Sequence, residues 1–66
     1  MRTNLKIFRI QQQLNQNEMA AKTGFERAYY GHIERGYMRG SSLFWDRLQE
    51  AFGLSDKAIE ELKKNE

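Results

Sequence analysis

The sequence contains no cysteine and no proline, has a single histidine, and lacks any long hydrophobic run. Without cysteine it can form neither disulfides nor thiolate metal sites, which fits a reducing compartment. One histidine cannot hold a zinc ion alone. Spanning a bilayer takes about 18 consecutive apolar residues, and the first ten residues, MRTNLKIFRI, lack the apolar core of a signal peptide. We therefore expect a soluble cytoplasmic protein with no metal, no cofactor and no membrane contact.

A strong excess of one charge sign is also missing, since the formal net charge is +2. The charge is unevenly divided, because residues 1–39 carry seven Lys/Arg against three Asp/Glu, whereas residues 40–66 carry four against six. The basic half suits a phosphate-rich surface, and the acidic half would face away from it. Ordinary scatter of surface charge explains the division about equally well, so charge alone does not decide between the two.

With 66 residues the chain allows one small domain, which buries only about 60% of the surface exposed on unfolding. Strand alternation, repeats and low-complexity segments are absent, and apolar residues recur at helical spacing. We therefore predict an all-α fold, a compact bundle of five short helices in a single domain spanning 1–66. The expected helices are 3–12, 16–23, 27–35, 43–52 and 56–64.

Caps and apolar stripes set these boundaries. Side-chain oxygens are expected to cap the helices, the candidates being Thr3, Asn15, Ser41, Ser42 and Ser55. Glycines at 24, 36 and 53 follow three helices, where a helix commonly ends in a residue of positive φ. Trp45 and Phe52 should supply the bulk of the core, and Ile7 and Ile10 lie beside the apolar stripe of the first helix.

The segment from Gln16 to Gly36, QNEMAAKTGFERAYYGHIERG, contains two of the predicted helices, joined at one glycine. The second of them buries Tyr30 and Ile33 at i, i+3. The residues left on its outer face are Arg27, Ala28, Gly31 and His32. This pattern predicts a helix-turn-helix whose second helix enters the DNA major groove.

These segments resemble a known family. LKxxR from Leu5, LNQxEMAxKxGF from Leu14 and YxxIERG from Tyr30 resemble the Cro/C1-type (XRE-like) helix-turn-helix regulators of phages and bacteria. The later FWDRLQEAFGLS is similar to the fourth-helix segment of small regulators from phages and mobile elements. The resemblance implies a lambda-repressor-like DNA-binding domain and a repressor or Cro-like regulator of transcription, acting on double-stranded DNA by promoter occupancy.

The resemblance also implies roles for matching positions. Those that relatives use for base edges are Glu26, Arg27, Ala28, Tyr29 and His32. Those expected at DNA phosphates are Asn15, Gln16, Arg35, Tyr37 and Arg39. Gln16 should in addition brace the start of the recognition helix. Arg9 and Glu34 match a structural ion pair that bridges the first helix to the end of the recognition helix.

The chemistry of the base-reading positions is uneven. Arg27 can donate two hydrogen bonds to guanine O6 and N7, and Ala28 can meet a thymine methyl group. Glu26 can accept from cytosine N4, but beside phosphates it would instead repel DNA or orient Arg27. Tyr29 suits a base or the sugar-phosphate, and His32 is equally well a solvated residue. Which of Ala28, Tyr29 and His32 reaches a base stays open.

Some positions depart from the family pattern. Thr23 and Tyr30 stand where aliphatic residues are usual, and Gln49 where a small residue is usual. Gly31 costs about 1 kcal/mol relative to alanine inside a helix. These departures affect how the recognition helix is seated.

A homodimer is expected on a pseudo-palindromic operator, with half-sites about 34 Å apart. Ile59 and Leu62 are candidates for the dimer contact and equally good core residues. Met1 and a folded C-terminal end favour a complete small protein over an excised N-terminal domain of a longer repressor. The sequence shows no sign of a small-molecule ligand.

Two other classes of function compete with DNA binding. A protein-interaction module, antirepressor-like or antitoxin-like, would keep the fold without binding DNA, and the acidic second half favours it. The basic side chains on and near the recognition helix (the reader) favour DNA, and they are Arg27, Arg35 and Arg39. An enzyme is the weakest reading, because the sequence has no phosphate-binding glycine loop and no nucleophile elbow.

Overall fold

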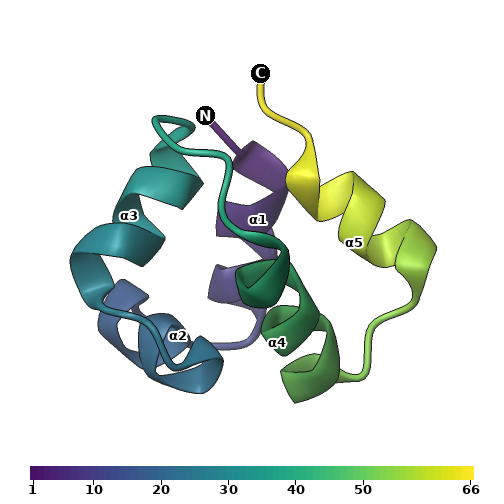
Figure 1. Cartoon of the computed structure of the whole chain (residues 1–66), viewed down its shortest axis with the longest axis horizontal. Coiled ribbons are helices and arrows are strands. Elements are labelled where there is room, and N and C mark those ends of the chain that lie inside the picture. The colour runs from purple at the N-terminus through teal and green to yellow at the C-terminus, as the bar shows by residue number, and fades with distance from the viewer.

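The computed structural model describes residues 1–66 and contains five helices and no strand (Figure 1). The helices are α1 (Thr3–Gln11), α2 (Gln16–Thr23), α3 (Arg27–Arg35), α4 (Ser42–Phe52) and α5 (Asp56–Lys63). The prediction of an all-α fold of five helices is confirmed. The helix boundaries lie within one residue of the expected ones, and none of the helices has the length and hydropathy needed to cross a bilayer.

Side-chain caps begin three of the helices. Asn15 Oδ1 accepts the Glu18 amide at 2.8 Å, and the Glu18 carboxylate accepts the Asn15 amide at 2.9 Å, which is a capping box. The Ser41 and Ser55 hydroxyls each accept, at 3.1 Å, from the amide three residues later. These local bonds explain why the starts of α2, α4 and α5 follow from the sequence.

Two of the predicted caps are wrong. Thr3 is already the first residue of α1, and Arg2 holds the cap position without a side-chain cap bond. The Arg2 amide instead donates to the Glu34 carbonyl at 2.8 Å, so a tertiary contact fixes this end of the helix. Ser42 is likewise the first residue of α4, because Ser41 supplies the cap.

One apolar core joins the helices, and its buried members are Leu5, Met19, Ala20, Tyr30, Ile33, Phe44, Trp45, Leu48, Ile59 and Leu62. Trp45 is buried, as predicted. Phe52 is only half-buried, because it is the last residue of α4. Its ring packs edge-on against Phe8 of α1, with ring centroids 5.1 Å apart. Phe44 takes the central place instead, since it is fully buried and contacts four other aromatic rings.

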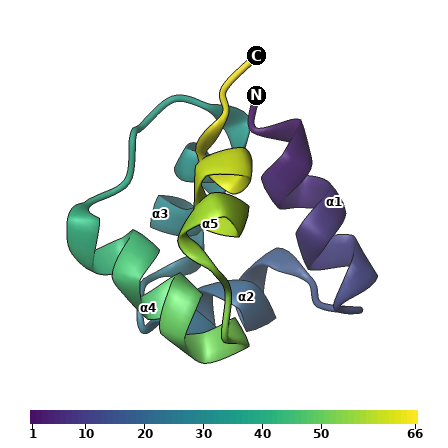
Figure 2. The same ribbon diagram turned by 90° about the vertical axis from the view of Figure 1, so that its right-hand side faces the viewer.

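The first and last helices lie side by side, and both chain ends emerge near the end of α3 (Figures 1 and 2). The Met1 ammonium donates to Asn65 Oδ1 at 2.8 Å, and the Asn65 amide donates to the Gly36 carbonyl at 3.2 Å. Ile59 and Leu62 are core residues of α5, so they are not available for a contact between copies. Ile7 and Ile10, expected beside the core stripe, are 47% and 55% exposed on the outer side of α1.

Candidate nucleic-acid interface

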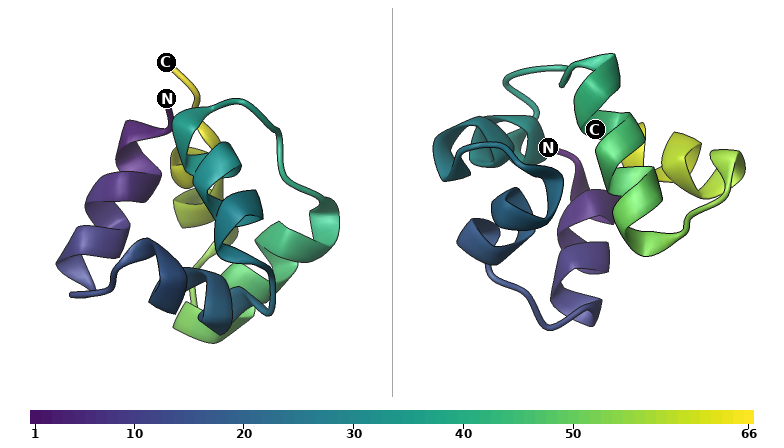
Figure 3. Two further views of the ribbon diagram at one scale, coloured as in Figure 1. Left: turned by 90° about the vertical axis from the view of Figure 1, so that its left-hand side faces the viewer. Right: turned by 60° about the horizontal axis from the view of Figure 1, so that its bottom comes forward.

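The two helices α2 and α3 form a helix-turn-helix, and they lie nearest the viewer in the left view of Figure 3. The turn begins at Gly24, whose φ of +74° is in the left-handed region that favours glycine. The Phe25 amide donates to the Ala20 carbonyl at 3.1 Å, which closes the end of α2. The small buried side chain of Ala20 lets the two helices cross closely.

One face of α3 packs into the core and the other is open. The buried residues of this helix are Tyr30, Gly31, Ile33 and Glu34. Gly31 was predicted to face away from the core, and there it is buried beneath a side chain of its own helix. A Cβ added at Gly31 would lie 3.2 Å from Arg35 Nη2, so the Arg35 side chain covers this position. The exposed residues of α3 are Arg35 at its end and Arg27 and Ala28 in its first turn.

That first turn presents Glu26, Arg27 and Ala28, all exposed. Glu26 is the N-cap residue, but its side chain makes no cap hydrogen bond. Neither of the two ion pairs in the chain involves Glu26 or Arg27, so the carboxylate does not orient the guanidinium through an ion pair. The donors of Arg27 are free to bind another molecule.

Tyr29 is held from two sides. Its ring stacks on Phe25 with centroids 4.9 Å apart, and its hydroxyl accepts the Ser41 amide at 2.9 Å. The hydroxyl thus lies at the start of α4, beside the loop that follows α3. The hydroxyl proton of Tyr29 can still be donated to a ligand.

The far end of α3 carries an exposed cluster of polar and aromatic side chains. The Arg35 guanidinium lies 5.6 Å from the centroid of the Tyr37 ring, and the His32 ring lies 6.0 Å from it. His32 is half-buried, and its Nδ1 atom is buried without a hydrogen-bond partner. Tyr37 is 73% exposed and Arg39 is exposed, so both can reach a ligand along this edge.

A buried carboxylate fixes the end of the reader against α1. Glu34 accepts from Arg9 Nε at 2.9 Å and from Arg9 Nη2 at 3.2 Å, which is the expected ion pair in bidentate form. Burial alone would raise the pKa of Glu34, but hydrogen bonds from Arg9 and Gln16 and the nearby Tyr30 hydroxyl outweigh it, so the pKa is lowered.

The Tyr30 hydroxyl itself is buried and lacks the geometry of a hydrogen bond to any partner. Burial first, and then the neighbouring Glu34 carboxylate, raise the pKa of Tyr30. It is therefore a neutral phenol that contributes mainly by packing in the core, where it is fully buried.

Gln16 was expected to brace the start of the recognition helix, but it contacts the other end of that helix. Its Nε2 donates to Glu34 Oε1 at 3.2 Å, near the end of α3. The reason is the chain direction: the turn joins the end of α2 to the start of α3, so the first residue of α2 lies away from that start. One amide N–H of Gln16 stays free for another acceptor.

Arg2 is a further structural residue that the sequence did not indicate. Its guanidinium donates to the carbonyls of Ile33 and Met38 at 2.7 Å, of Lys63 at 3.1 Å and of Arg39 at 3.4 Å. It also lies 5.6 Å from the centroid of the Trp45 ring. Burial lowers the pKa of this guanidinium. No periodic or spacing signal marks an arginine at this position.

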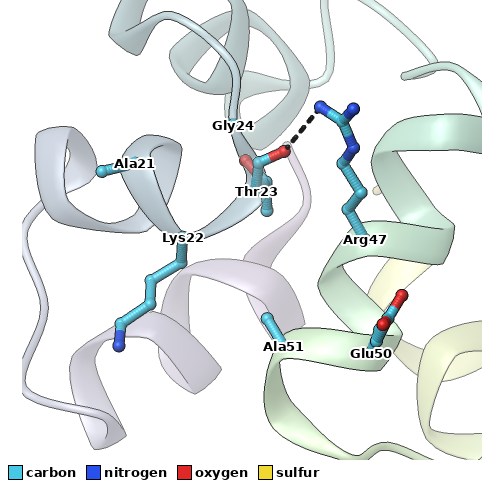
Figure 4. A pocket seen from close by; sticks show the side chains of 7 residues that line it. All are labelled: Ala21, Lys22, Thr23, Gly24, Arg47, Glu50 and Ala51. Carbon is cyan, nitrogen blue, oxygen red and sulfur yellow. Dashed lines mark hydrogen bonds between the residues drawn. The ribbon is translucent and has the colours of Figure 1, made fainter.

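A hollow between α2 and α4 lies behind the turn (Figure 4). It is lined by Ala21, Lys22, Thr23, Gly24, Arg47, Glu50 and Ala51. Arg47 reaches across it toward the turn, donating to the Thr23 carbonyl at 3.4 Å and lying 5.4 Å from the Phe25 ring centroid. The hollow is lined by the cations Lys22 and Arg47 and by the anion Glu50, so its charge favours a ligand of neither sign.

Comparison with known proteins gives one match. A family model described as helix-turn-helix matches residues 5–59, from the first helix into the last. No curated protein and no solved structure matches the chain.

Proposed function

The chain belongs to the Cro/C1-type helix-turn-helix family of DNA-binding regulators, and on this basis we propose that it is a sequence-specific repressor or Cro-like protein of a phage or mobile element. It acts by occupying a promoter, without catalysis. The observation that carries the proposal is the exposed first turn of α3, where the Arg27 side chain has no ion-pair partner, on a helix whose far end is fixed by Glu34.

In this mechanism the first turn of α3 enters the major groove. Arg27 donates two hydrogen bonds to a guanine, and Ala28 contacts a thymine methyl group. Glu26, Tyr29 and His32 are the further base-reading candidates, with Tyr29 and His32 restrained by their neighbours. The Arg9–Glu34 pair holds the helix at a fixed angle, so DNA binding loses little conformational entropy in ordering this helix.

Phosphate contacts flank the reader. The proposed residues are Asn15, Gln16, Arg35, Tyr37 and Arg39. Gln16 keeps one amide N–H free, as required for a phosphate contact, although its other N–H is held by Glu34. The basic half of the chain carries α1 to α3, and the acidic half carries α4 and α5, so the charge division favours approach of DNA from the side of the reader.

A single reader touches few base pairs, so we propose that two copies bind a pseudo-palindromic site. Because Ile59 and Leu62 are buried, contacts between copies must use other residues. The large apolar side chains that are exposed are Met1, Ile7, Ile10, Tyr37, Met38 and Leu43.

A protein-interaction module is the second candidate function. Ile7 and Ile10 are about half exposed, at 47% and 55%, on the outer side of α1, where an apolar partner surface could pack. The unpaired Arg27 at the start of α3 has no role in that reading, so DNA binding is the stronger proposal.

The deciding experiment is binding to short duplexes of random sequence as a function of salt. Releasing counterions from phosphates makes affinity fall with salt, with a log–log slope of about −0.9 per phosphate neutralised. Arg35 and Arg39 alone then give a slope near −2 per protomer. Selection from the same pool would give the operator and its half-site spacing. Absence of duplex binding at low salt would favour the interaction module.

A further inference from the structure

A second pocket lies on the side of the chain ends, between the α3–α4 loop and α5. It has a volume of about 330 Å³ and is lined by Arg2, Arg39, Gly40, Ser42, Trp45 and Lys63. Three of these six residues are cationic and none is acidic. They come from the residue before α1, the loop, the first two turns of α4 and the last residue of α5, so tertiary packing assembles the charge.

Arg2 brings a positive charge to this pocket without a counter-ion. Arg2 is only 5% exposed, and its side chain donates hydrogen bonds only to backbone carbonyls. Both ion pairs of the chain lie elsewhere, at Arg9–Glu34 and Lys64–Glu61. A buried cation without a partner is costly, and an anion beside it would offset that cost.

One donor of Arg2 remains for such an anion. A guanidinium has five N–H groups, and four hydrogen bonds are formed: one by Nε, two by Nη1 and one by Nη2. The Nη2 bond, to the Arg39 carbonyl at 3.4 Å, is also the longest of the four. The free N–H therefore belongs to the terminal nitrogen that is held least tightly.

The other lining residues complete a set of groups that suit an anion. The Lys63 ammonium lies 5.8 Å from the centroid of the Trp45 ring, and the Arg39 side chain is exposed beside the loop. Ser42 adds a hydroxyl at the first residue of α4, an eleven-residue helix whose amino-terminal end favours negative charge.

We propose that this pocket binds a phosphate group. A phosphate group offers more acceptor oxygens than a carboxylate to donors that come from several elements. The exposed Arg39 guanidinium can donate paired bonds to phosphate oxygens, and Arg2 adds its one free N–H. The phosphate belongs either to the DNA backbone, passing along the α3–α4 loop, or to a free phosphate monoester. The DNA source rests on the proposed function, whereas the free source does not.

The first arm of the test titrates inorganic phosphate at constant ionic strength, with chloride as the compensating anion. Trp45 is the only tryptophan, so NMR shows a single indole N–H signal, and that N–H donates to the carbonyl of the pocket residue Arg39 at 3.0 Å. We expect a saturable shift in the wild type and in Lys57→Gln, a control at the opposite end of α5. Lys63→Gln should weaken phosphate binding roughly tenfold, while its backbone carbonyl still accepts from Arg2.

The second arm measures duplex affinity of the same variants against salt. If the phosphate is that of DNA, Lys63→Gln lowers affinity and reduces the salt slope by about 1 relative to Lys57→Gln. If it is a free monoester, the two variants bind DNA equally and differ only with phosphate. Equal behaviour of the two variants in both arms overturns the proposal.

Two controls separate the possible failures. If thermal unfolding shows that Lys63→Gln does not fold, Arg39→Gln replaces it in the phosphate titration, since the Arg39 side chain is exposed and only its carbonyl contacts Arg2. The duplex arm then uses Ser42→Ala, at a lining residue outside the proposed DNA contacts, because Arg39 is itself one of those contacts. If no variant binds DNA, the proposed function fails, and the phosphate titration still decides whether the pocket binds a free phosphate.

Discussion

Glu34 is a charged residue of the recognition helix that faces the core. It is 1% exposed, and its carboxylate is held by Arg9 and Gln16, which belong to two other helices. Such a group sets the angle of the reader without touching DNA.

Replacing Glu34 by Gln should therefore lower the free energy of unfolding by about 3 kcal/mol, because removing one partner of a buried pair leaves the other uncompensated. Glu26→Gln, at an exposed position on the same helix, is the matched control and should change it by less than about 0.5 kcal/mol. Urea unfolding measures both. Similar values for the two variants would contradict a structural role for the pair.

The same carboxylate predicts a pH dependence. Its pKa is lower in the folded state than the usual glutamate value of about 4.3. The stability that it contributes is then fully present above that value and is lost as the pH falls through the lower folded pKa. Urea unfolding between pH 7 and pH 3 should show a smaller loss of stability on acidification for Glu34→Gln than for the wild type.

Substitutions of Arg27 and Arg39 should distinguish recognition of bases from binding to phosphates. Loss of a paired contact to guanine costs about 1–3 kcal/mol of discrimination, so Arg27→Ala should reduce preference for the selected site roughly tenfold. Arg39→Ala should weaken selected and random duplexes alike and lower the salt slope by about 1. Competition binding at two salt concentrations distinguishes these outcomes, and the reverse pattern would exchange the two roles.

At the scale of the element, α3 contains a glycine where a helix prefers alanine. Gly31 does not have a positive φ, and the nearest neighbours of an added Cβ would be atoms of the Arg35 guanidinium at 3.2 to 3.5 Å, which would have to shift slightly. Gly36, which ends the helix, has a φ of +84° and would place a Cβ against the Asn65 side chain. The backbone conformation therefore requires a glycine at Gly36 but not at Gly31.

Gly31→Ala should accordingly raise the free energy of unfolding by up to about 1 kcal/mol, from helix propensity. Gly36→Ala should lower it by about 1 kcal/mol or more, because alanine is strained at positive φ. Thermal unfolding of both variants checks the pair. A destabilised Gly31→Ala would mean that the packing of Arg35 over the helix outweighs propensity.

At the scale of the whole molecule, Arg2 connects the start of α1 to the end of α3, the following loop and the end of α5. Lysine keeps the charge but cannot reproduce the planar set of donors. Arg2→Lys should therefore lower the free energy of unfolding by about 2 kcal/mol. Arg47→Lys, where one bond of 3.4 Å is at stake, should cost less than about 1 kcal/mol. Equal effects in urea unfolding would rule out Arg2 as the link.

The sequence by itself determined the five helices to within one residue at each end. The signals for these boundaries are local: the Asn15–Glu18 capping box, the Ser41 and Ser55 caps, and glycines that end helices in the left-handed region. Helical periodicity likewise identified Tyr30 and Ile33 as buried, since only a few residues of chain set the face of a helix. The partnership of Arg9 and Glu34 followed from family resemblance, because periodicity does not pair distant residues.

Only the tertiary structure decided which long side chains reach which partners. Arg2 joins carbonyls 31 to 61 residues away, Gln16 binds the end of the reader, and Arg35 covers Gly31. A long side chain has many rotamers, and the carbonyls or carboxylates that select one of them come together only when the helices pack. The physical reason is therefore range: caps and periodicity act within a few residues, whereas the charge of the second pocket and the seating of α3 depend on contacts across the whole chain.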